Sequence, residues 1–399
     1  MFQVFIILDF LFLVVQETCN SYAKYRTYDG SCNNLINPSW GKAKTPQRRF
    51  EYNGHKMVDY DDDVDHPRGG LPSKLPSPRL ISNKLMAEEL GPADQSSPTL
   101  SGQHFAFGQA LTHDFITYRE QINDVTSYID CSHVYGSSDA QLATLRDTTD
   151  SFLLKTSPGN NLPEKKTGFC RRKPESTDFC QLTGDSRNDQ VPSLQLNHLV
   201  LVREHNRLAK MLKQINPYWD NDRVFEETRR IVIAEMQHIT YNEYLPAILS
   251  PRSMKRYNLR PRKCGFDDCY DVKIDAAKLQ YYIDRSCDDI DLFVGGLLEK
   301  SKNGRVGETF ACLIGKQFYL TKYGDRYWYE RKECGFTEAQ LNAIKKMTMS
   351  KVLCENFGLD RIQKKAFLRP ENKGKLRFCD TLPGLNLFLW REKDWQPEH

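Results

Sequence analysis

The clearest hydrophobic pattern in this 399-residue sequence is a helical stripe that begins near residue 193. Its apolar members recur at the three- to four-residue spacing of one helix face. They are Leu194, Leu201, Leu208, Leu212 and Ile215. His198 and His205 lie on the same stripe, so we interpret both as hydrogen-bonded core histidines rather than ligands.

A second helical segment follows the turn at Asn216–Asp222, which is rich in capping residues. Phe225, Val232 and Ile239 repeat seven apart, a spacing that keeps them on one face. We expect this helix to run to about residue 244 and to end at Pro246, because proline has no N–H and clashes inside a helix.

Further signals indicate a mainly α domain. Thr337 and Gln340 form the sequence pattern of a capping box, and the helix after them is expected to stop near Gly358. Residues 20–100 are irregular and rich in turn residues. Long helices joined by irregular segments, with few alternating strands, favour helix-on-helix packing.

Composition narrows the class of protein. The hydrophobic share is 39%, which suffices for a sizeable core, and the net charge of +4 comes from mixed signs. Such mixing argues against a nucleic-acid surface, which needs clustered Lys and Arg. The apolar run in residues 1–18 is too short to span a membrane comfortably, so we expect no stable membrane anchor and interpret the run as a weak secretion signal.

Twelve cysteines are typical of a secreted chain and many for a cytosolic one. None of the spacings that we compared is the tight C-x-x-C pair of a zinc site. The cysteines therefore favour disulfides and an extracellular location, with scattered free thiols as the alternative.

One stretch concentrates the candidate chemistry. His113 is followed by Asp114, and a histidine beside an acceptor carboxylate can act as an acid–base catalyst or a metal ligand. Hard oxygen donors follow, and with Asp114 they make a plausible Ca²⁺ shell. They are the hydroxyl and carbonyl of Thr126, the carbonyl of Tyr128, Asp130 and Ser132. Arg187, in a loop that leads into a helix, can stabilise a developing anion.

Several long segments, in order, resemble the animal haem peroxidases. Among them are GQALTHDFITYREQINDVTSYIDCSHVYGSS (Gly108–Ser138), GDSRNDQVP (184–192) and REHNRLAKMLKQINPYWDNDRVFEETRRIVIAEMQHITYNEYLP (Arg203–Pro246). The resemblance covers nearly all of the chain from Cys19 onward. It implies a single helical haem-peroxidase-like domain over residues 19–399, with an irregular N-terminal arm.

The resemblance also implies roles for particular residues. His113 stands where the family has its distal histidine, Arg187 at the distal arginine and Gln109 at the glutamine of the same cavity. The calcium shell matches at Asp114, Thr126, Tyr128, Asp130 and Ser132. The implied cofactors are haem b and Ca²⁺, and the implied substrates are hydrogen peroxide and a small electron donor. Disulfides common in the family match Cys19–Cys32, Cys170–Cys180 and Cys354–Cys379.

The sequence differs from the family pattern at positions that attach or ligate the haem. Thr112 and Gln190 stand where carboxylates often form esters to haem, so any haem is expected to be held non-covalently. Blocks of sequence are missing near 118/119 and between about 270 and 288, and no Phe-Arg-x-x-His segment supplies the proximal histidine. Cys312 matches a cysteine whose usual partner lies in an absent block.

Three hypotheses follow. The first is an extracellular haem peroxidase that oxidises small donors with hydrogen peroxide. The second is a non-catalytic secreted variant without the proximal ligand. The third is a calcium-binding remnant without haem, provided that Asp114 reaches the loop at Thr126–Ser132 across the shortened connection.

Overall fold

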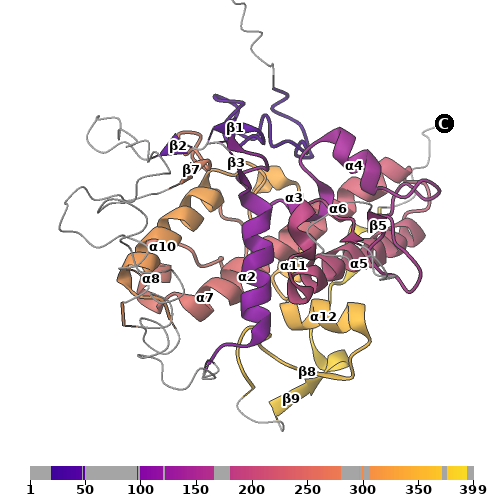
Figure 1. Ribbon diagram of the computed structural model, residues 1–399. Helices are drawn as coiled ribbons and strands as arrows, with labels where there is room; N and C mark the ends of the chain where they lie inside the picture. Colours follow the sequence, from indigo (N-terminus) through magenta and orange to yellow (C-terminus); the bar gives the residue numbers. More distant parts are fainter. Residues whose placement is uncertain are drawn as a thin grey trace, which may run out of the picture.

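The protein is described from a computed structural model, which describes residues 19–46, 48–49, 97, 99–119, 122–165, 180–279, 296, 299–300, 305–370 and 375–392. The expected mainly α architecture is confirmed, because long helices form the body and the strands are short (Figure 1). The segment at 1–18 and its proposed secretion signal lie outside the described residues. No described helix is long and apolar enough to cross a membrane.

The described helices include a π-helical turn, η4, and four 3₁₀ turns, η3, η5, η7 and η8. In chain order the helical elements are α2 Gly102–Phe115, α3 Ser132–Tyr135, α4 Asp139–Leu145, η3 Ser186–Asp189, α5 Pro192–Ile215, α6 Asn221–Ile239, η4 Thr240–Tyr244, α7 Leu245–Ile248, α8 Pro251–Arg256, α10 Glu308–Tyr323, η5 Lys332–Cys334, α11 Glu338–Ile344, α12 Met349–Phe357, η7 Cys379–Thr381 and η8 Leu387–Trp390.

The strands pair over two or three residues each. They are β1 Thr45–Pro46, β2 Arg48–Arg49, β3 Tyr118–Arg119, β4 Ile122–Asn123, β5 Glu164–Lys165, β6 Cys180–Gln181, β7 Lys278–Leu279, β8 Arg361–Gln363 and β9 Leu376–Phe378. The largest sheet has the order β1-β4-β3, and β2 pairs with β7 in parallel. The others are the antiparallel pairs β5-β6 and β8-β9.

The core forms where α5 and α6 pack together, with α2, α11 and α12 against them (Figure 1). The predicted stripes face this core, since Leu208 and Leu212 on α5 and Phe225 and Val232 on α6 are fully buried. His198 and His205 are buried with them, which confirms their interpretation as core residues. His205 interacts through Nδ1 with the Tyr135 hydroxyl at 3.0 Å.

One predicted helix end was wrong, whereas the predicted stop near Gly358 is confirmed, because Gly358 is the C-cap of α12. The helical path of α6 does not stop at Pro246 but passes through the π-helical turn η4 into α7, which ends at Ile248. Pro246 lies in the first turn of α7, where its missing N–H is not needed. The segment before Gly358 is two helices, because Thr348 caps a new helix, α12, by accepting from the Lys351 N–H. The capping box at Thr337 and Gln340 is confirmed.

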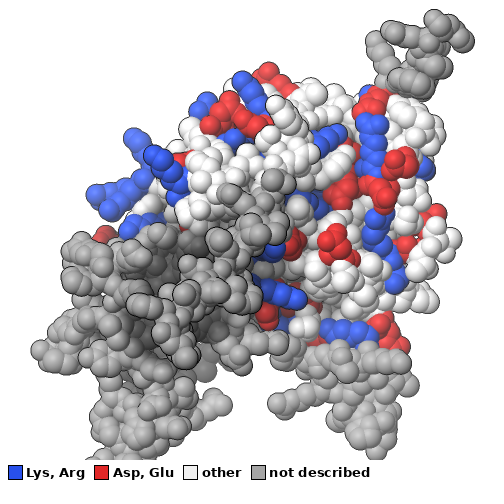
Figure 2. Space-filling model, turned by 90° about the horizontal axis from the view of Figure 1, so that it is seen from above, with Lys and Arg blue, Asp and Glu red and all other residues white. Residues whose placement is uncertain are grey.

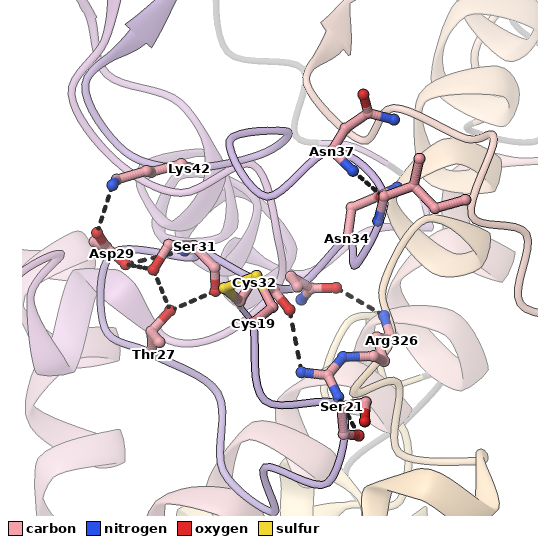
Figure 3. The surroundings of a disulfide bond; sticks show 12 residues. Cys19, Ser21, Thr27, Asp29, Ser31, Cys32, Asn34, Asn37, Lys42 and Arg326 are labelled. Atoms are coloured by element: carbon pink, nitrogen blue, oxygen red, sulfur yellow. Dashed lines mark hydrogen bonds and ion pairs between the residues drawn. A yellow bond between two sulfur atoms is a disulfide. The ribbon is translucent and has the colours of Figure 1, made fainter. Parts of the chain in front are cut away.

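The N-terminal arm is irregular up to β1 and is fastened by the disulfide Cys19–Cys32 (Figure 3). The Arg326 guanidinium donates to the backbone oxygens of Ser21 and Cys32, both at 3.1 Å (Figure 3). The Arg326 backbone N–H donates to Asn33 Oδ1 at 2.8 Å. The arm is therefore tied to the segment that follows α10.

The other cysteines follow the expected pattern in part. Cys354–Cys379 is a disulfide, and Cys180 is disulfide-bonded, while Cys170 lies outside the described residues. Cys312 is free, as are four more of the described cysteines. The described surface in Figure 2 carries Lys, Arg, Asp and Glu interspersed, in keeping with the mixed charge of the sequence.

Candidate peroxide and calcium site

Helix α2 carries the first part of the candidate site. Gln109 and His113 lie one helical turn apart on it, and α2 packs against α5 and α3. His113 is 4% exposed, and its ring centroid lies 6.1 Å from that of His198 on α5. His113 is therefore fixed inside the fold rather than presented on a loop.

The surroundings of His113 keep its imidazole neutral. Its Nδ1 has no hydrogen-bond partner and lies 3.7 Å from Asp185 Oδ1. Burial and the nearby Arg187 cation lower the pKa of His113 to about 4, against the opposing effect of Asp185. At neutral pH the ring is unprotonated, which is the form that can accept a proton.

Arg187, on η3, is held beside the C-terminal end of α2. Its Nε donates to Asp185 Oδ1 at 3.0 Å, and Nη2 donates to Asp185 Oδ2 at 2.6 Å. Nη2 also donates to the carbonyls of Ile116, at 2.9 Å, and His113, at 3.3 Å. The guanidinium therefore binds both a carboxylate and the carbonyl end of a helix, where a cation is favoured.

The side chain of Gln109, on α2, contacts that of Gln190, which directly follows η3. The Gln109 Nε2 donates to Gln190 Oε1 at 3.1 Å, while Gln109 Oε1 is buried without a partner. The Thr112 hydroxyl donates back to the Gly108 carbonyl at 2.9 Å. The two positions at which the family often has ester-forming carboxylates are thus occupied by side chains that hydrogen-bond within the protein.

A hollow of about 670 Å³ lies along this face of α2. Gln109, Thr112, His104 and Tyr244 line part of it, and the His104 and Tyr244 rings stack at 4.7 Å. This volume is in the usual range of a cofactor or ligand pocket. Gln109, with its unpaired Oε1, is the only one of the three predicted distal residues among the residues that line this hollow, and His113 and Arg187 are not among them. The proximal side does not fit the family pattern, since the sequence has no Phe-Arg-x-x-His.

The first of the predicted calcium donors, Asp114, lies at the end of α2. Asp114 is fully buried, and its carboxylate accepts from the backbone N–H of Ser132 at 2.6 Å and of Cys131 at 3.1 Å. The Ser132 hydroxyl donates to the Asp114 carbonyl at 2.5 Å. The shortened connection therefore still brings Asp114 to the loop.

Thr126 and Asp130 complete this cluster. The Thr126 hydroxyl lies 2.9 Å from both carboxylate oxygens of Asp130, and Asp130 Oδ1 accepts from the Ser132 N–H at 3.1 Å. The Tyr128 side chain points elsewhere, donating to the Trp40 carbonyl at 2.8 Å. Tyr128 can therefore contribute its backbone carbonyl, as the sequence suggested.

The donor set fits Ca²⁺. Burial and the neighbouring Asp114 raise the pKa of Asp130, because the two carboxylates lie near each other in the interior of the protein. A divalent cation would allow both to be charged, and carboxylate, hydroxyl and carbonyl oxygens are the ligands that Ca²⁺ prefers. Within the described ranges no group of three or more His, Cys, Asp or Glu residues is arranged to hold a metal ion. The proposed calcium shell depends on hydroxyl and carbonyl oxygens for most of its donors.

Sequence reasoning missed three residues of the site. Asp185 lies in the motif of Arg187 and pairs with it, and His133 Nδ1 lies 3.2 Å from Asp114 Oδ1. Asn123 donates to the carbonyl of Phe115, next to Asp114. An acidic residue two positions before Arg187 was a usable signal, whereas the other two contacts depend on tertiary packing.

The fold is a scaffold of packed helices. A model of the animal haem peroxidase family matches residues 25–118, 116–282 and 271–367, which is most of the chain. The chain therefore belongs to the animal haem peroxidase family. The match comes in three successive pieces, whose boundaries fall near 116–118 and 271–282.

Comparison with individual proteins gives the same family. The chain is 26% identical to the chorion peroxidase of Drosophila melanogaster, over 93% of this chain and 71% of that protein. It is 25% identical to human myeloperoxidase, over 95% of this chain and 78% of that protein. Its match spans only 38% of Drosophila peroxidasin. The alignment with chorion peroxidase runs over 584 positions, far more than the length of this chain.

A solved structure supports the fold. Peroxidase A of Dictyostelium discoideum superposes with a TM-score of 0.65 at 20% identity, over 86% of this chain and 99% of that one. At this identity the similarity concerns the fold. The helical architecture predicted from the sequence is thus that of a peroxidase.

Proposed function

We propose that this protein is an extracellular haem peroxidase that uses hydrogen peroxide to oxidise small electron donors. Haem b, held without covalent links, is its cofactor, and Ca²⁺ is its structural ion. The proposal rests mainly on the position of His113, whose buried, neutral imidazole lies beside the Arg187 cation. That pair is the acid–base and electrostatic half of a peroxide site.

The chain's own residues act on the peroxide. The Nδ1 of His113 lies toward Asp185, so we assign proton uptake to Nε2, on the other edge of the ring. The imidazole then returns this proton to the departing oxygen, while Arg187 provides positive charge beside it. Asp185 favours the protonated ring and so limits the cost of the intermediate charge. Haem, when bound, supplies the redox chemistry.

The proposed calcium ion fixes the position of His113 through Asp114, the next residue in the sequence. Asp114 follows His113 in α2, so an ion held by Asp114, Asp130 and the oxygens of Thr126, Tyr128 and Ser132 anchors the end of the helix that carries the histidine. The contacts of Asp114 with the loop support this site. They are the reason to prefer a calcium-holding form over one in which the shortened connection has destroyed the loop.

A non-catalytic secreted form is the second candidate. It is favoured by a separate observation: the sequence has no Phe-Arg-x-x-His, and two separate pieces of the family match meet and overlap at residues 271–282. The proximal histidine sets the behaviour of the haem iron and fixes it in place. In this alternative the fold and the calcium site persist without turnover.

Haem reconstitution separates the two candidates. The purified chain is mixed with haem and Ca²⁺, and the Soret band and the peroxide-dependent oxidation of a phenol are recorded. A shifted Soret band with turnover that is lost in His113→Ala supports the peroxidase. Calcium binding without a Soret shift or turnover supports the non-catalytic form. His238→Gln is the matched control, because it changes a buried histidine whose partner is the Tyr329 hydroxyl.

A further inference from the structure

The connection between α2 and the calcium loop is a very short hairpin. Strand β3 follows α2 almost at once and pairs antiparallel with β4, with Tyr118 opposite Asn123. Strand β4 also pairs with β1, where Thr45 lies opposite Asn123. Asn123 is therefore the central position of the β1-β4-β3 sheet, between the end of α2 and the loop that starts at Thr126.

The side chain of Asn123 joins the two ends of this hairpin. Its Nδ2 donates to the Phe115 carbonyl at 3.0 Å, and its Oδ1 accepts from the Thr117 N–H at 2.8 Å. The same amide lies 3.5 Å from the Ser127 hydroxyl and from the Val125 N–H. The residue is 2% exposed, so these bonds form away from water.

The backbone around Asn123 is fixed as well. The Lys44 N–H donates to the Asn123 carbonyl at 2.7 Å, and the Asp124 N–H donates to the Thr117 carbonyl at 2.8 Å. These backbone hydrogen bonds fix the position of the Asn123 side-chain amide relative to the end of α2. Its partner Phe115 directly follows Asp114, and Val125 directly precedes Thr126.

We infer that Asn123 is a positioning residue for the calcium site, and this rests on the proposed calcium function. Ca²⁺ needs six to eight oxygens at about 2.3–2.6 Å, so the donors from α2 and those from the loop must lie close together. Asn123 sets where α2 ends relative to the loop, and so where the Asp114 carboxylate lies relative to Asp130. The clamp compensates for the shortness of the connection in this chain.

The test compares Asn123→Ala with Asn206→Ala in calorimetric titrations with Ca²⁺ alone. Asn206 is a matched control because it is 5% exposed and forms an equivalent two-bond clamp, with Oδ1 accepting from the Leu154 N–H at 2.8 Å and Nδ2 donating to the Leu154 carbonyl at 2.9 Å. Both variants lose a buried amide clamp. Only Asn123→Ala is expected to weaken Ca²⁺ binding, by at least about tenfold, equivalent to about 1.4 kcal/mol.

The outcomes separate the inference from the proposed function. If Asn123→Ala binds Ca²⁺ like the parent, or if Asn206→Ala loses as much affinity, the positioning role is wrong while the calcium site stands. If the parent chain does not bind Ca²⁺, or if Asp130→Ala binds it equally well, the proposed calcium site itself is wrong. Should Asn123→Ala fail to fold, Asn123→Ser is used instead, because its hydroxyl is too short to reach both Phe115 and Thr117.

Discussion

Asp114 and Ser132, eighteen positions apart in the sequence, are joined by two hydrogen bonds. The Ser132 N–H donates to the Asp114 carboxylate at 2.6 Å, and the Ser132 hydroxyl donates to the Asp114 carbonyl at 2.5 Å. This pair links the end of the helix that carries His113 to the loop that carries Asp130. The predicted distal histidine and the proposed calcium loop are therefore held together by direct hydrogen bonds in this chain.

Asp114→Asn should weaken Ca²⁺ binding by at least about tenfold, because it removes one of two charged donors from a buried shell. In thermal unfolding, Ca²⁺ should stabilise the parent by about 2.7 kcal/mol at a hundred times its Kd. The variant should show a much smaller gain at the same concentration. Asp147→Asn is the control, since its side chain accepts from the Thr149 and Asp150 N–H groups outside the site. Equal gains for all three proteins would refute the assignment of Asp114.

Asp185→Asn should destabilise the fold by about 1–3 kcal/mol, because Arg187 loses a buried charged partner. Urea unfolding at neutral pH measures the change. Asp268→Asn removes an exposed partner of Lys332, 3.7 Å away, and should cost no more than about 0.5 kcal/mol. Similar small losses in both variants would mean that Asp185 does not hold Arg187 as described.

Stability should fall as the solution is acidified from about pH 6.5, the usual pKa of histidine. Burial lowers the pKa of His205 to about 3 in the fold, so between these values the unfolded chain binds a proton that the folded chain does not. The contribution of His205 is fully present above pH 6.5 and is lost at about 1.4 kcal/mol per pH unit below it. His205→Gln should flatten this pH dependence measurably. An unchanged slope would show that His205 is not buried as a neutral ring.

Removing the Cys354–Cys379 disulfide should cost about 3 kcal/mol, the usual effect of a closed loop of this size. The double variant Cys354→Ala/Cys379→Ala is compared with Cys312→Ala in denaturant unfolding. Cys312 is free and half-buried, so its replacement removes no cross-link and should have a much smaller effect. A double variant as stable as the parent would mean that this bridge does not constrain the chain.

The sequence predicted the long helices well because their apolar residues repeat with helical period. The stripe on α5 and the capping box at Thr337 fall where they were expected. The π-helical turn before Pro246 and the break between α11 and α12 were not predictable, because both keep the helical pattern of apolar residues running through them. The pattern reports which face is buried and is insensitive to a change of helix type.

The site residues divide in a similar way. His113, Arg187 and the proposed calcium donors could be predicted because they lie in recognisable motifs. Asp185, His133 and Asn123 were missed because their roles come from contacts made only in the folded protein, such as the bond from Asn123 to the Phe115 carbonyl. Nothing in the spacing of Asn123 from the loop distinguishes it from an ordinary turn residue.

His113→Ala should reduce peroxide-dependent turnover of the haem-loaded protein by about 10²–10⁴-fold, because it removes the general acid–base group. Haem uptake should persist, since His113 is assigned to the distal side and not to the iron. His238→Gln should retain turnover within a few fold. A His113→Ala protein that turns over like the parent would contradict the assigned role.

The most direct test of the proposed function is haem titration of the full chain in the presence of Ca²⁺, followed by acidic acetone extraction and a peroxide assay with a phenol. The account predicts a shifted Soret band that saturates at one haem per chain. It also predicts haem that extracts completely, since Thr112 and Gln190 cannot form esters, and oxidation of the phenol that depends on peroxide. A titration without a Soret shift or turnover, on a chain that still binds Ca²⁺, would contradict the peroxidase assignment.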